Sequence, residues 1–231
     1  GKRNILNIDG ADYLTTVYVN GKKVGVHEGA YARFSFDLTD FLRGGENVLV
    51  VRCDDANDPS LIRGKQRWED HNHGCHYVQM TGIWKSVWME YAEEDRLEYV
   101  RITPYPNDGE VEFTFTVTHP APDVSIGYRI EYAEKEVAAG KVAAIGAEQR
   151  VRVRLASDKS ADIVGISYMD WPSMYDVQFT VEKREKVTDQ VGSYFGMADF
   201  SVRDGQFTHC MIPKYLKMVL DQGYWPESGF T

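Results

Sequence analysis

Short runs in which apolar and polar residues alternate recur along the sequence, with turn residues between them. The runs Thr16–Val19 and Val24–Val26 flank Asn20-Gly21. Asn-Gly is the strongest short hairpin signal because both residues tolerate the positive φ that a tight two-residue turn requires. Similar runs follow at 34–38, 48–53 and 83–89. The first 92 residues are therefore predicted to be built from β-strands.

The acidic triplet Glu93-Glu94-Asp95 predicts a linker, and a second set of strands follows it. Several short strands separated by turn residues are typical of a β-sandwich. We place this second sandwich at 96–185 and interpret 186–231, with its glycine-spaced strand and short amphipathic run, as a linker to further structure. The strands are expected at 97–102, 111–117, 126–132, 149–155 and 176–181.

Composition and charge exclude some classes of partner. The 231 residues include 26 Lys+Arg against 35 Asp+Glu, which gives a net charge of -9. Because an acidic surface repels phosphate backbones, nucleic acid is not an expected partner. No apolar run approaches the ~20 residues of a membrane helix, so no membrane partner is expected either. Cys53, Cys75 and Cys210 are interpreted as free thiols, and this count leaves the compartment open.

Several blocks of the sequence, in a fixed order, carry a family resemblance. The first half resembles the sugar-binding jelly roll of glycoside hydrolase family 2, whose members include β-galactosidases, β-glucuronidases and β-mannosidases. Trp171–Val177 resembles a corner late in the immunoglobulin-like domain of that family, and 194–197 and 220–226 resemble the start of its catalytic TIM barrel. The blocks of the first half are 17–25, 27–31, 34–39, 44–51 and 81–88.

The resemblance implies a fold and a domain order. The fold class is all-β, with a partial galactose-binding-like jelly-roll sandwich over 1–92 that lacks N-terminal strands. An immunoglobulin-like β-sandwich over 96–185 follows, and 186–231 is a linker and the start of a truncated TIM barrel. The chain is expected to be the non-catalytic part of an enzyme that hydrolyses O-glycosyl bonds and is most similar to a β-galactosidase.

The same resemblance implies that the chemistry lies elsewhere. Hydrolysis with retention uses two carboxyl groups about 5–5.5 Å apart, one as acid/base and one as nucleophile. In this family the acid/base stands in an Asn-Glu dipeptide on a barrel strand, and no Asn-Glu dipeptide occurs in this sequence. We therefore expect no catalytic residue within these 231 residues. We also expect no cofactor and no metal.

The long polar stretch 54–81 contains the predicted substrate-binding residues, because loops of this length in compact domains are usually functional. Lys65 and Gln66 resemble a family segment directed toward the active site, and both can donate to sugar hydroxyls. Trp68 can stack on the apolar face of a sugar. Asp55 resembles an acidic residue that reaches the pocket in the β-galactosidase branch. The alternatives are a solvated loop that docks on the next domain and, for Asp55, a turn-capping carboxylate.

His71, His73, Cys75 and His76 form a cluster of residue types that bind zinc. The alternate spacing within one loop does not match the separated pairs of a structural zinc site, so we predict no metal here. Trp84 and Trp88 lie four residues apart in an alternating run and thus on one side of a strand, where they are expected to pack.

The expected partners are a carbohydrate, bound weakly through one wall of a pocket, and the catalytic barrel of the parent chain. Val48–Val51 is expected to be buried on both faces. If strands are missing, a homo-oligomer through exposed strands, around Ile5–Ile8 or Val17–Val26, is a further expectation. A stand-alone carbohydrate-binding module and a structural adhesion sandwich stay open as alternatives. Only the module predicts sugar binding much tighter than millimolar by these residues alone.

Overall fold

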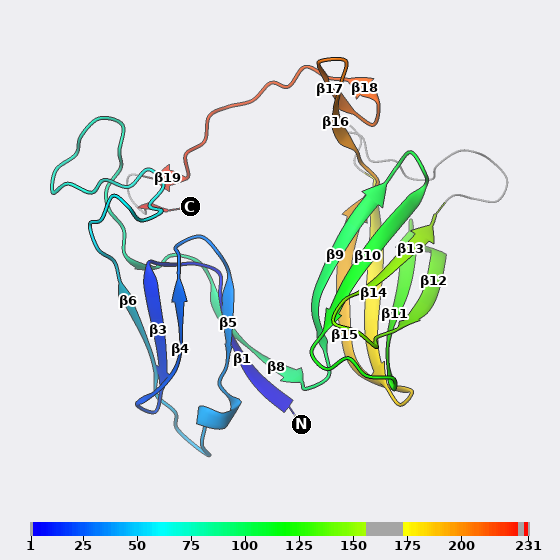
Figure 1. Cartoon of the computed structure of the whole chain (residues 1–231), viewed down its shortest axis with the longest axis horizontal. Coiled ribbons are helices and arrows are strands. Elements are labelled where there is room, and N and C mark those ends of the chain that lie inside the picture. The colour runs from blue at the N-terminus through cyan, green and yellow to red at the C-terminus, as the bar shows by residue number, and fades with distance from the viewer. Residues whose placement is uncertain (1, 156–172, 226–228, 231) are drawn as a thin grey trace. The chain divides into compact units, whose positions relative to one another are not determined.

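A computed structural model describes residues 2–155, 173–225 and 229–230 of the chain (Figure 1). The described part is built almost entirely from β-strands, which confirms the all-β prediction. It divides into two compact units, Gly1–Ala92 with Val219–Thr231, and Glu93–Met218. Within the described ranges, no helix has the length and apolar character needed to cross a membrane. Trp171 and Pro172 of the predicted corner lie outside the described residues.

The first unit contains two three-stranded sheets. One has the order β5 (Phe34–Asp37), β1 (Lys2–Ile8), β8 (Val87–Glu93), and the other has the order β4 (Lys22–Glu28), β3 (Leu14–Val19), β6 (Leu49–Asp54). A short pair, β2 (Ala11–Asp12) with β7 (Gly82–Ile83), and the single 3-10 turn η1 (Thr39–Phe41) complete it. The apolar core is small: its buried members are Leu6, Ile8, Ala11, Val17, Val19, Phe34 and Leu38.

The predicted Asn-Gly hairpin between β3 and β4 is confirmed. Asn20 and Gly21 have φ values of 52° and 78°, which a two-residue hairpin turn requires. The Asn20 side chain also fixes the neighbouring loop, because its amide donates to Asn47 Oδ1 at 2.8 Å and its oxygen accepts from the Val48 amide at 3.1 Å. This turn thus sets the register of three strands at once.

The expectation that Val48–Val51 is buried on both faces is wrong. Val48, Leu49 and Val50 are 52%, 42% and 50% exposed. The physical reason is that β6 pairs with β3 on one side only and forms the edge of its sheet in the described part of the chain. Of the strands suggested for intermolecular pairing, β1 (Ile5–Ile8) and β3 are central in their sheets, whereas β4, which contains Lys22–Val26, is a sheet edge.

The second unit is a larger sandwich. One sheet has the order β13 (Gln149–Arg154), β10 (Glu110–Val117), β9 (Leu97–Tyr105), and the other has the order β12 (Lys135–Ala143), β11 (Val124–Tyr132), β14 (Met174–Lys183), β15 (Lys186–Gly196). Alternate residues of these strands meet in a core dominated by Phe113, Phe115, Phe179 and Tyr175, each fully buried.

The second sandwich extends past the predicted limit at residue 185. Strand β15 pairs with β14 along its whole length, from Lys186 to Gly196. Arg184 and Glu185 form the turn between them with φ values of 49° and 63°. Neither residue type is a strong turn signal, because side chains other than Gly, Asn and Asp rarely adopt positive φ. The local residue types therefore do not indicate that the sandwich continues there.

The remaining strands are short. β16 (Phe200–Arg203), β17 (Gln206–His209) and β18 (Ile212–Pro213) form a small sheet in the second unit. β19 (Tyr224–Trp225) pairs with β20 (Gly229–Phe230), and both belong to the first unit. Residues 186–231 are therefore divided between the two units in the structure.

Candidate functional site

The polar loop between β6 and β7 is anchored by a buried ion pair. Arg63 Nη1 donates to Asp55 Oδ1 at 2.8 Å, and the two side chains are 4% and 1% exposed. The other carboxylate oxygen of Asp55 accepts from Thr81 Oγ1 at 3.1 Å, and Arg63 also donates to the carbonyl of Ala56. The start, middle and end of the loop are thus held together at one buried carboxylate.

A second buried contact joins the loop to the short strand β2. Gln66 is 1% exposed, and its Nε2 donates to Asp12 Oδ2 at 2.7 Å while its Oε1 accepts from the Met80 amide at 2.6 Å. Burial raises the pKa of Asp12, and the charge of Asp55 acts in the same direction, whereas the Gln66 hydrogen bond and Arg63 oppose this shift. Asp12, Asp55, Arg63 and Gln66 form one polar network, which we call the loop anchor.

The predicted binding residues separate into two groups. Asp55 and Gln66 belong to the loop anchor. Both carboxylate oxygens of Asp55, and both the nitrogen and the oxygen of the Gln66 amide, already form hydrogen bonds within the protein. Trp68 is 37% exposed. Lys65 is half-buried, and its ammonium donates to Cys75 Sγ at 3.2 Å. Lys65 and Trp68 are therefore the two predicted residues whose side chains a ligand can reach without breaking the anchor.

Two of the histidines pack around Trp68. Its ring centroid lies 4.8 Å from that of His73 and 4.6 Å from that of His76, each in an edge-on arrangement. His71 instead faces the carboxylates of Glu69 and Asp70. Among the described residues, no group of three or more His, Cys, Asp or Glu side chains is placed to hold a metal ion. His73 and His76 therefore pack against the Trp68 ring and hold it in place.

Tyrosines extend this site, and one of them comes from the far end of the sequence. Tyr224 stacks on Tyr77 with a centroid distance of 4.7 Å, and Tyr77 Oη donates to Gln222 Oε1 at 2.8 Å. Tyr224 and Tyr31 both donate to the Arg63 carbonyl, at 3.4 and 3.3 Å. Burial, followed by the hydrogen bond with Tyr31, raises the pKa of Tyr224.

Next to these contacts lies a cavity of about 370 Å³ whose lining includes three aromatic residues. Sequence reasoning missed Tyr31 and Tyr224 because the two residues lie 193 positions apart in the sequence. The available signals are the positions of the two tyrosines in blocks 27–31 and 220–226 of the family resemblance. The lining residues are Tyr31, Gly64, Lys65, Trp84, Gln222, Gly223 and Tyr224.

A second cavity, of about 610 Å³, lies where the loop leaves β6. Its polar lining is acidic, with Glu28, Asp54 and Asp55 among the residues around it. Tyr13 Oη donates to Glu28 Oε1 at 3.3 Å across this region. Hydroxyl-rich ligands pair well with carboxylate acceptors, so this second cavity suits a polar, uncharged molecule.

Residues 1–92 match the family described as "Glycosyl hydrolases family 2, sugar binding domain". These 92 residues belong to glycosyl hydrolase family 2. A β-galactosidase of Thermoanaerobacter pseudethanolicus is 25% identical over 214 residues, which are 90% of this chain and 28% of that protein. A β-galactosidase of Klebsiella pneumoniae is 30% identical over 140 residues, which are 58% of this chain and 13% of that protein.

The fold agrees with this assignment. The crystal structure of a β-glucuronidase from Ruminococcus gnavus superposes with a TM-score of 0.71 at 20% identity, covering 99% of this chain and 38% of that one. The chain thus spans well under half the length of these relatives. The match to both β-sandwich units confirms the predicted fold class.

Proposed function

We propose that this family 2 chain is the non-catalytic part of a glycosidase, in which the first sandwich supplies one wall of the sugar pocket. Lys65 and Trp68 contact the saccharide, Lys65 as a hydrogen-bond donor and Trp68 as a stacking surface. Asp55 and Gln66 act on the sugar indirectly, because they hold the loop that carries these two residues. The match of residues 1–92 to a sugar-binding domain supports this proposal.

The loop anchor is the observation that carries the proposal. A surface loop that served only as a connection would have no need for a fully buried Asp–Arg pair and a buried Gln, because burying charged groups costs free energy. Holding a binding loop in one conformation lowers the entropy lost when a ligand binds. The anchor therefore fits a loop that presents side chains to a ligand.

Hydrolysis itself is assigned to the catalytic part of the parent protein, beyond these 231 residues. The sequence contains no Asn-Glu dipeptide of the kind that supplies the acid/base in this family. With one wall of the pocket, little of a sugar is buried, whereas good ligand sites bury most of it. We expect the purified chain to bind a monosaccharide with a Kd of about 1 mM or weaker, which corresponds to about −4 kcal/mol.

The test combines activity and binding on the purified 231-residue chain. Nitrophenyl β-galactoside and β-glucuronide should not be hydrolysed above background. In an NMR titration with galactose, Trp68→Ala should abolish the chemical-shift changes in the loop, while the matched variant Tyr91→Ala should keep them. Tyr91 is a suitable control because it is an aromatic residue of the same unit and is 68% exposed.

Three results would overturn the proposal. Turnover that is lost when a carboxylate of this chain is mutated would place the chemistry here. Micromolar binding by calorimetry would favour a stand-alone carbohydrate-binding module. Loop shifts of equal size in Trp68→Ala and Tyr91→Ala would remove Trp68 from the site.

A further inference from the structure

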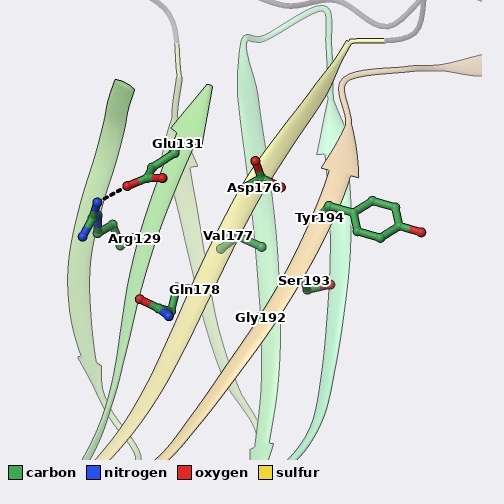
Figure 2. Close-up of a pocket in the computed structure, with 8 residues that line it drawn as sticks. All are labelled: Arg129, Glu131, Asp176, Val177, Gln178, Gly192, Ser193 and Tyr194. Carbon is green, nitrogen blue, oxygen red and sulfur yellow. Dashed lines mark hydrogen bonds and ion pairs between the residues drawn. The ribbon is translucent and has the colours of Figure 1, made fainter. Parts of the chain in front are cut away.

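The outer face of the larger sheet in the second unit contains a pocket of about 490 Å³ (Figure 2). Its residues come from three adjacent strands, β11, β14 and β15. The volume falls within the roughly 300–1,000 Å³ of typical small-molecule sites. Polar groups dominate the lining, which consists of Arg129, Glu131, Asp176, Val177, Gln178, Gly192, Ser193 and Tyr194.

Strand register places the outward side chains in two rows across the sheet. Glu131, Asp176 and Tyr194 are cross-strand neighbours in one row. Arg129, Gln178 and Gly192 are neighbours in the next row. Because alternate residues of a strand point to opposite faces, both rows lie on the face opposite the core. The backbone therefore presets the spacing of these groups.

A glycine and an exposed aromatic ring shape one side of the pocket. A side chain at Gly192 would meet no atom within 4 Å, so the absent side chain leaves a hollow above β15. Tyr194 stands two residues further along the same strand and is 69% exposed. Figure 2 shows its ring extending outward from β15, at the edge of the pocket. An exposed aromatic ring beside a polar hollow offers an apolar surface with hydrogen-bonding groups next to it.

The hydrogen-bonding groups at the centre of the pocket are available. Arg129 is held by Glu131, and its Nε lies 3.2 Å from Glu136 Oε2. Asp176 and Gln178, by contrast, have no side-chain hydrogen bond or ion pair within residues 2–155, 173–225 and 229–230, and both are exposed. A carboxylate accepts and a carboxamide both donates and accepts, so adjacent Asp and Gln side chains can bind neighbouring hydroxyls of one ligand.

We propose that this face of the second sandwich is a separate saccharide-binding surface, specific for uncharged pyranose sugars. Tyr194 stacks on the apolar C–H face of a pyranose ring, and Asp176 and Gln178 bind its hydroxyls. Charge selects the ligand, because Glu131, Glu136 and Asp176 carry three negative charges around the single guanidinium of Arg129. A uronic acid placed here would meet like charges. The surface shares no residue with the loop of the first unit, so it goes beyond the function proposed above.

The experiment is an NMR titration of the full 231-residue chain with cellotriose and β-1,4-galactobiose, repeated with digalacturonate. Resonances of β14 and β15 should shift saturably with at least one neutral probe. Tyr194→Ala should weaken that binding about tenfold, or about 1.4 kcal/mol, because the stacking surface is lost. Tyr99→Ala, an equally conservative change at a tyrosine of the opposite sheet that is 58% exposed, should stay within about twofold.

Two further variants test the role of charge and the independence of this surface from the first unit. Asp176→Asn should raise the affinity for digalacturonate by removing one repulsive charge. Trp68→Ala should leave the titration unchanged, so a failure of the first-unit site does not affect this test. The proposal is overturned if neither neutral probe shifts the β14 and β15 resonances saturably, or if Tyr194→Ala and Tyr99→Ala weaken binding equally. It is also overturned if digalacturonate binds as tightly as the neutral probes, since charge would then play no part.

Discussion

The two sandwiches of this chain are both built from β-strands, but different interactions stabilise them. The second unit has sixteen buried apolar residues in its core, and the first has seven, in the described part of the chain. The first unit instead buries a polar network at its long loop and leaves apolar side chains exposed on its edge strands. The second unit has its proposed binding surface on a sheet face, whereas the first has its site on a loop.

Because of this difference, the two units are sensitive to different kinds of substitution. A sandwich held by interdigitating aromatic rings loses stability when a ring is removed, because the neighbours cannot fill the space. A loop held by a buried ion pair loses its conformation when one partner is removed, because the remaining charge is left without compensation. Variants in the two units should therefore act on different transitions.

The largest expected effect is in the second core. Phe113 is fully buried and lies 5.1 Å from Phe179 and 5.9 Å from Phe115, measured between ring centroids. Phe113→Ala should destabilise the second unit by about 3–5 kcal/mol. Leu6→Ala in the first unit should fall at the lower end of about 2–5 kcal/mol, because fewer buried neighbours surround it.

Guanidinium denaturation can separate the two units. Trp68, Trp84, Trp88 and Trp225 belong to the first unit, so tryptophan fluorescence reports mainly on it, while far-ultraviolet circular dichroism follows both. Phe113→Ala should move the dichroism transition and leave the fluorescence midpoint in place. A single transition that moves as a whole would show that the units unfold together.

An effect of comparable size is expected at the loop anchor. Arg63→Ala should cost the first unit about 3–5 kcal/mol, because it leaves the buried Asp55 carboxylate without its partner. The double variant Asp55→Asn with Arg63→Met should recover much of this loss, since no buried charge remains unpaired. Fluorescence-detected denaturation measures both. Equal losses in the single and double variants would mean that the pair does not stabilise the loop through its charges.

Much of the fold could be predicted because its signals are local. Asn20-Gly21 identifies a hairpin on its own, and the alternation of β10 and β14 identifies the inward side chains of the second core. The β14–β15 turn could not be predicted because Arg184 and Glu185 adopt positive φ without a residue type that signals it. The exposure of Val48–Val50 depends on which strands lie beside β6, and no local pattern encodes that.

The candidate site was predictable as a region but not residue by residue. The loop 54–81 stands out because it is long and polar, and Lys65 and Trp68 are indeed accessible in it. Whether a polar side chain faces a ligand or the interior depends on distant partners. Gln66 turns toward Asp12, 54 residues away in sequence, and Tyr224 reaches the Arg63 carbonyl across 161 residues. Such contacts are set by tertiary structure alone.

A smaller effect is the pH dependence of the anchor. Because burial raises the pKa of Asp12 above its unfolded value, the folded protein takes up a proton at a higher pH than the unfolded chain. The ionised carboxylate thus destabilises the first unit at pH 7, and this penalty is relieved as the pH falls through the raised pKa. Asp12→Asn, which keeps an oxygen for Gln66, should be more stable than the parent at pH 7.

The matching measurement is urea denaturation of the parent and Asp12→Asn, followed by fluorescence between pH 7 and pH 4. The stability difference between the two proteins should shrink toward the acidic end. A difference that instead grows as the pH falls would show that Arg63 and Gln66 outweigh burial and that the ionised form of Asp12 stabilises the anchor.

The smallest expected effect tests the open edge of the first sandwich. Val50 on β6 is 50% exposed, whereas Val17 on the adjacent strand β3 is fully buried. Val→Thr changes a methyl group to a hydroxyl with almost no change in volume, so it compares the two environments directly. Val50→Thr should change stability by less than about 0.5 kcal/mol, because its hydroxyl meets water. Val17→Thr should cost about 1–3 kcal/mol, because its hydroxyl is buried among apolar side chains.

If Val50→Thr costs as much as Val17→Thr, then β6 is covered in solution. In a purified sample, the covering partner would have to be a second copy of the chain. Sedimentation velocity of the parent chain should then show association that increases with concentration.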